Sequence, residues 1–196
     1  MMTRRLCIIL LTIVLAGCGL NVTRNILPVA DQDVVILPRV KGAASHKNEI
    51  SLIVVPLEDV KEADAFGVMI VNESSHWLKF KKEDFVLIQG GDVRKPMSES
   101  QVNVRMGASY KPTMPKELTA DLYEWRKSIN IRDSRGFRVI DEDKTLSVMR
   151  GNKEVIYVFF KTTDDISPMQ LIIPNIQKEE TGERIRFSFT FEVEKK

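Results

Sequence analysis

The residues from 184 to 194 alternate strictly between polar and apolar side chains, and this alternation constrains the fold more than any other feature of the chain. The apolar set is Ile185, Phe187, Phe189, Phe191 and Val193. A strand points successive side chains to opposite faces, whereas a helix repeats about every 3.6 residues. The segment is therefore predicted to be a strand with one face on a hydrophobic core and the other toward solvent.

Shorter β-branched and apolar runs precede this strand. They are residues 49–57, 65–72, 76–80 and 84–88 in the first half of the chain, and residues 154–161 and 169–173 in the second. Turn-forming residues separate them, such as Gly90 and Gly91 after the fourth run and Pro174 after the last. A succession of short strands and turns predicts a mainly β fold, an antiparallel β-sandwich.

One segment has helical periodicity instead. Its recurring apolar residues are Leu118, Leu122, Trp125 and Ile129. Pro115 suits a first helical turn, so we predict a helix over about residues 116–130, inside an insertion that spans residues 101–152 of the sandwich. The rest of the insertion reads as turns, with a short strand expected at residues 137–140.

The first twenty residues have the layout of a secretion signal. Arg4 and Arg5 form a positive start, and residues 6–15 form an apolar run. This run is too short to span about 30 Å of hydrocarbon as a helix, so a signal peptide is expected rather than a membrane-spanning anchor.

The end of this leader, Leu15-Ala16-Gly17-Cys18, resembles the lipobox of bacterial lipoproteins. The resemblance implies cleavage after Gly17, with Leu15, Ala16 and Gly17 as the cleavage context, and a covalent lipid on Cys18. Two or more acyl chains hold a protein stably on a bilayer. Because Gly19 replaces the aspartate that retains such proteins at the inner membrane, the resemblance implies an outer-membrane lipoprotein that faces the periplasm, with export to the surface as an alternative.

After the signal peptide, residues 1–17, we expect a lipidated tether over residues 18–48 and a β-sandwich domain over residues 49–196. Pro28, Pro38 and Gly42 interrupt the tether segment, although residues 33–38 are apolar enough for a short strand.

The central strands resemble the immunoglobulin-like β-sandwich domains of many bacterial envelope lipoproteins. Residues 68–75, VMIVNESS, are similar to the strand and turn of that group, and residues 80–87 pass through a charged turn into the next strand. The resemblance implies a fold but no activity, because such sandwiches serve many functions.

Charge and cysteine content exclude several classes of function. The whole chain has 29 basic and 27 acidic residues, and the leader removes two arginines and no acid. The mature chain is then neutral, which gives no reason to expect a nucleic acid partner. Cys7 leaves with the leader and Cys18 carries lipid, so we expect no disulfide and no cofactor other than the lipid.

Catalytic and metal-binding motifs are scarce. The sequence has no nucleophile elbow, no glycine-rich phosphate loop and no cysteine pair. It has two histidines, and His76 is expected to be a strand-edge residue because no second histidine or cysteine is near it. We assign no catalytic residue and no metal site, although the acidic runs 141–143 and 164–165 leave calcium as an alternative.

The aromatic residues Trp77 and Tyr110 are the candidates for contact with a partner, Tyr110 because it lies in the loop of residues 107–115. We therefore expect a lipid-anchored envelope protein that binds or positions another envelope component without catalysis. One alternative is an accessory or pilot lipoprotein for an envelope or secretion complex. The other is a hydrolase of cell-wall or glycan substrates, which would need two carboxylates around a cleft.

Overall fold

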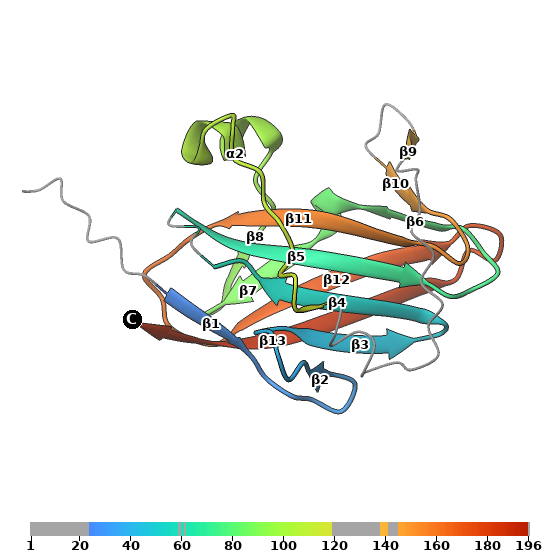
Figure 1. Cartoon of the computed structure of the whole chain (residues 1–196), viewed down its shortest axis with the longest axis horizontal. Coiled ribbons are helices and arrows are strands. Elements are labelled where there is room, and N and C mark those ends of the chain that lie inside the picture. The colour runs from blue at the N-terminus through green and yellow to red at the C-terminus, as the bar shows by residue number, and fades with distance from the viewer. Residues whose placement is uncertain (1–23, 59, 61, 119–137, 141–144, 196) are drawn as a thin grey trace, which may run out of the picture.

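The protein consists of two antiparallel β-sheets that pack face to face (Figure 1). The computed structural model describes residues 24–58, 60, 62–118, 138–140 and 145–195. The described part is mainly β and contains one α-helix, so the expected fold class is correct at this level. Among the described residues, no helix has the length and apolar character needed to cross a bilayer.

The larger sheet has eight strands. Six of them follow one another in the spatial order β1 (Arg24–Pro28), β13 (Arg184–Lys195), β12 (Met169–Lys178), β6 (Leu78–Lys81), β10 (Thr145–Val148) and β9 (Arg138–Ile140). The other two form a branch: β7 (Val86–Gln89) pairs with β12, and β8 (Asp92–Arg94) pairs with β7. A single turn of 3-10 helix, η2 (Lys82–Asp84), joins β6 to β7. The first and last described strands of the chain, β1 and β13, therefore lie side by side in one sheet.

The smaller sheet has five strands. In spatial order they are β11 (Lys153–Lys161), β5 (Ala63–Asn72), β4 (Ile50–Pro56), β3 (Ala43–Lys47) and β2 (Val35–Ile36). β5 pairs with β11 along nine residue pairs and with β4 on its other side, so it is an interior strand of this sheet, and it is buried throughout.

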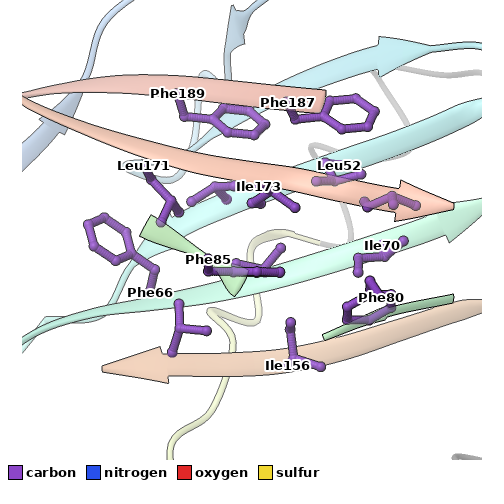
Figure 2. Close-up of a cluster of buried hydrophobic side chains, with 14 of the residues drawn as sticks. Leu52, Phe66, Ile70, Phe80, Phe85, Ile156, Leu171, Ile173, Phe187 and Phe189 are labelled. Carbon is purple, nitrogen blue, oxygen red and sulfur yellow. The ribbon is translucent and has the colours of Figure 1, made fainter. Parts of the chain in front are cut away.

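The main core lies between the two sheets. Phe187 and Phe189 of β13 face Phe66 and Ile70 of β5 across it (Figure 2). The ring centroids of Phe66 and Phe191 are 5.1 Å apart. All five apolar residues of β13 are buried, and the polar residues between them are exposed or half-buried, so the alternation predicted from the sequence is confirmed.

The prediction of a tether over residues 18–48 is wrong for the part of this range that the structure describes. β1 and β3 lie within it, and each forms five residue pairs with a strand of the sandwich. The short strand expected at residues 33–38 appears as β2. Among the described residues, sheet structure is thus present from Arg24 onward and not only from Glu49.

Pro174 was expected to end the strand of residues 169–173, but the strand continues past it. β12 continues to Lys178, and its register against β13 shifts between Ile173 and Ile176. Proline has no N–H to donate and is tolerated inside a sheet at such a bulge, so the shift lets the strand continue.

The helix of the insertion lies earlier than predicted. α2 spans Glu99–Met106 and begins at Ser98, which forms a capping box with Gln101. The helix predicted over 116–130 falls mostly on residues 119–137, which lie outside the described residues, as do the acidic residues 141–143. The strand expected at 137–140 is confirmed as β9, while β10 was not predicted.

The turn between β3 and β4 contains strained backbone. Asn48 and Glu49 have φ of 48° and 63°, and they form a two-residue turn between the paired residues Lys47 and Ile50. Asparagine and glycine adopt such angles readily, but glutamate does not.

Replacing Glu49 with glycine should therefore raise the free energy of unfolding by about 0.5–1 kcal/mol, measured by urea denaturation. The control is Glu49→Gln, which removes the charge near Lys178 but keeps the strained backbone. Equal stability changes in the two variants would mean that charge, and not backbone angle, sets the cost.

Candidate functional site

A buried ionic cluster closes one end of the two sheets. Asp64, near the start of β5, has a side chain that is only 2% exposed, and two arginine side chains face it. The Nη1 atom of Arg24 lies 3.0 Å from the Asp64 Oδ1 atom, and the Nη1 atom of Arg94 lies 2.7 Å from Oδ2. We call Arg24, Asp64 and Arg94 the Asp64 cluster.

The Asp64 cluster connects the two sheets. Arg24 lies on β1 and Arg94 on β8 of the larger sheet, whereas Asp64 lies on β5 of the smaller sheet. Arg24 also donates to the Thr162 hydroxyl and to the main-chain oxygen of Asp165. The Nε atoms of both arginines are buried without a hydrogen-bond partner. A closed arrangement with this much burial is suited to holding strands together and not to contacting a substrate.

The loop of residues 162–168 packs against this cluster. The Asp165 Oδ1 atom accepts a hydrogen bond from the Ser167 N–H at 2.7 Å, and this bond is the main reason that the pKa of Asp165 is lowered, with Arg24 and Arg94 contributing. A Cβ atom on Gly90 would lie 1.9 Å from the Asp165 Oδ2 atom, and Gly90 has a φ of 56°, so a larger residue there would displace the Asp165 side chain and strain the backbone. The charged side chains that act on Asp165 are those of two arginines, and their positive charge disfavours calcium binding at this residue. Within the described ranges, no group of three acidic, histidine or cysteine side chains is placed to hold a metal.

Tyr110 lies beside a groove next to β4. The groove encloses about 410 Å³ and is lined by Pro56, Leu57, Glu58 and residues 110–116. The Tyr110 ring is half-buried and meets the Phe159 ring edge to face, with centroids 6.1 Å apart. Tyr110 thus serves partly as a packing residue and also forms one wall of the groove.

Met114 fixes the floor of this groove on the outer face of β5. A Cβ atom added at Gly67 would lie 2.2 Å from the Met114 sulfur atom. Gly67 therefore allows the segment around Met114 to lie directly on the sheet, and Leu118, at the end of that segment, is buried against the same face.

The variant Gly67→Ala should displace the Met114 side chain at a cost of about 1 kcal/mol in the free energy of unfolding, the low end of overpacking effects, because a methionine side chain can move. The double variant Gly67→Ala with Met114→Ala should show a smaller combined loss than the two single losses added together. Simple additivity in chemical denaturation would contradict the contact.

Trp77 lies at the other end of the sheets. Its main-chain N–H donates to the Glu180 Oε2 atom at 3.2 Å, and its main-chain oxygen accepts from the Glu179 N–H at 2.8 Å. His76 is next to it, with Nδ1 3.2 Å from Glu180. These hydrogen bonds hold Trp77 at the turn between β12 and β13. Tyr110 packs against Phe159 near the C-terminal end of β11, at the opposite end of the sheets. The structure therefore does not bring the two predicted contact residues together.

That end of the molecule is rich in paired charges. Lys178 is almost buried and lies 3.1 Å from the Glu183 carboxylate. Hydrogen bonds from Lys178 and Asn48 lower the pKa of Glu183. The His46 Nδ1 atom lies 3.0 Å from the Ser51 hydroxyl, which in turn donates to Glu73 at 3.0 Å. Such a chain resembles a catalytic relay, but Ser51 is fully buried and no substrate can reach its hydroxyl.

Neither of two surface hollows in the described part presents a pair of carboxylates. The groove beside Tyr110 has Glu58, which pairs with Lys41 at 2.6 Å. An open hollow beside β3 and β13, of about 520 Å³, has Asp33, which pairs with Lys47 at 2.9 Å, together with Arg184 and Arg186. Hydrolysis of glycosides usually needs two carboxylates around the bond, so these hollows give the hydrolase alternative no support.

The lipidation residues Leu15, Ala16, Gly17 and Cys18 lie outside the described residues. No family model matches the chain, and neither the curated proteins nor the solved structures include a significantly similar one.

Proposed function

We propose that the chain is a lipid-anchored protein of the bacterial cell envelope, whose β-sandwich domain binds or positions another envelope component. The observation that carries the proposal is the sequence Leu15-Ala16-Gly17-Cys18 directly after a charged start and a short apolar run. The acyl chains on Cys18 supply the membrane attachment, since each buried methylene contributes about 0.8 kcal/mol. Its compartment is the outer membrane, facing the periplasm.

The immunoglobulin-like resemblance is part of the proposal. Asn72, from the similar segment VMIVNESS, is buried, and its side-chain amide donates to the main-chain oxygens of His76 and Val148 at 2.7 and 3.1 Å. Its side-chain oxygen accepts from the Ser74 hydroxyl and N–H. A buried asparagine with these partners fixes the turn after β5, which supports the assignment of a structural role to this segment.

The binding surface is assigned to the groove beside Tyr110. It combines an aromatic ring, three prolines and the charged residues Glu58, Lys111 and Lys116 in a concave surface. An aromatic side chain within a concave, partly apolar surface is typical of partner recognition.

The anchoring test compares wild type with Cys18→Ala and with the matched leader variant Cys7→Ala. We expect wild type and Cys7→Ala to yield a mature chain that starts at residue 18, carries lipid by intact mass spectrometry and sediments with membranes. Cys18→Ala should give neither the lipid mass nor the sedimentation. An unmodified wild-type chain would contradict the anchor.

The binding test places a photo-crosslinking amino acid at Thr113, which is exposed on the groove segment, and at Ser75, which is exposed at the other end. In intact envelopes, position 113 should give a discrete adduct that purified domain competes away. Position 75 should give none. The same crosslinking pattern from both positions would contradict the groove as the binding surface, but it would not contradict the lipid anchor.

A further inference from the structure

Few residues separate Cys18 from the first described strand, because β1 begins at Arg24. Five residues, Gly19 to Thr23, separate the two. A chain spans at most about 3.6 Å per residue, so the Cα atoms of Cys18 and Arg24 are at most roughly 20 Å apart. A tether over all of residues 18–48, as expected from the sequence, would constrain the orientation of the domain far less.

Arg24 is also held firmly at its end of the sandwich. It pairs with Lys195 at the end of β13, and its guanidinium belongs to the Asp64 cluster. Releasing more chain would require breaking this buried ion pair and the hydrogen bonds of β1. The attachment point is therefore the end of the two sheets where β1 begins.

Two exposed apolar side chains lie at this same end. Val93 is 64% exposed and directly precedes Arg94 of the Asp64 cluster. Ile166 is 51% exposed and follows Asp165, whose main-chain oxygen accepts a hydrogen bond from Arg24. Figure 1 shows β1, the end of β13 and β8 gathered on this side of the molecule.

We infer that the short linker holds this end of the domain, with Val93 and Ile166, against the lipid bilayer and directs the turn between β12 and β13 away from it. The inference rests on the proposed lipid anchor at Cys18. β12 has ten residues, so the two ends are separated by roughly 33 Å at the usual rise of a strand. Charged residues Glu179, Glu180 and Glu183 therefore lie on the side that faces away from the membrane.

The experiment measures the depth of two labels on the lipidated protein. A fluorophore is attached at Ile166→Cys or, as the matched control, at Thr181→Cys, both exposed and at opposite ends of β12. The protein is purified from envelopes and reconstituted in vesicles of phosphatidylethanolamine and phosphatidylglycerol that contain a nitroxide-headgroup lipid. Quenching should be several-fold stronger at position 166 than at position 181.

A third sample carries a flexible glycine–serine insertion of about 20 residues after Asn21, which extends the linker by roughly 25 Å on average. The difference between positions 166 and 181 should then become small. If it persists, the short linker is not the cause and the inference fails.

Intact mass of the same samples separates the two ways of failing. Lipid on Cys18 with equal or reversed quenching overturns the orientation and leaves the anchor intact. An unmodified Cys18 overturns the proposed function, and the orientation with it.

Discussion

Replacing Phe189 with alanine is expected to lower the free energy of unfolding by about 3–5 kcal/mol. Phe189 is fully buried in the core between the sheets, at the middle of β13. It pairs in register with Leu171 of β12, and its ring lies among the side chains of Figure 2. The loss combines the transfer of a large apolar side chain to water with the cavity left behind, because the surrounding strands are held by hydrogen bonds on both sides.

Equilibrium unfolding in urea measures this effect, with Glu192→Ala as the control on the same strand. Glu192 is exposed, so its replacement should change the stability by no more than about 0.5 kcal/mol. A loss below about 1 kcal/mol for Phe189→Ala would mean that the site collapses around the smaller residue and that β13 is not central to stability.

Replacing Asp64 with alanine is expected to cost about 3–5 kcal/mol, because it leaves two nearly buried guanidinium groups without their common counter-charge. The Arg24 and Arg94 side chains are only 9% and 11% exposed. Their remaining partners are neutral oxygens of Thr162, Gln89 and the main chain, which do not compensate for the lost carboxylate. Thermal or urea unfolding measures the loss.

The control is Asp92→Ala, which replaces an exposed aspartate at the start of β8, the strand that carries Arg94, and should be nearly neutral. The triple variant Arg24→Met, Asp64→Leu, Arg94→Met should recover most of the stability, since an apolar replacement of a whole buried ion cluster leaves no unpaired charge. A triple variant as unstable as Asp64→Ala would show that shape, and not charge, determines the cost.

The fold class could be predicted because the longest strands carry their own signal. In β13 the pattern alternates over the whole strand, and β4, β5 and β11 are dense in β-branched residues. β1 and β3 could not be recognised, because they are short and contain polar residues, and their pairing depends on partners elsewhere in the chain. α2 could have been found from Ser98 and Gln101, which form a capping box, but its apolar face is short: only Val102 and Met106 pack against the domain, and both are partly exposed.

The Asp64 cluster was not found from the sequence, because its members are distant along the chain and fit no motif. One signal was present. Asp64 is the only charged residue in the otherwise apolar run ADAFGVMIV, and a charge inside such a strand must either disrupt it or find a partner. Which arginines would pair with it depends on the topology of two sheets. Trp77 and Tyr110 were identified as separate candidates, and only the structure shows that they belong to opposite ends.

The pairing of β1 with β13 determines the order in which the domain can fold. β1 is the first described strand to leave the ribosome or a translocation pore, and its partner is the last. Its backbone groups remain unpaired until β13 has emerged, and contacts so distant in sequence form slowly. A chain stopped before β13 would expose an open sheet edge, a template for aggregation, which makes the addition of β13 the step that commits the domain to its native state.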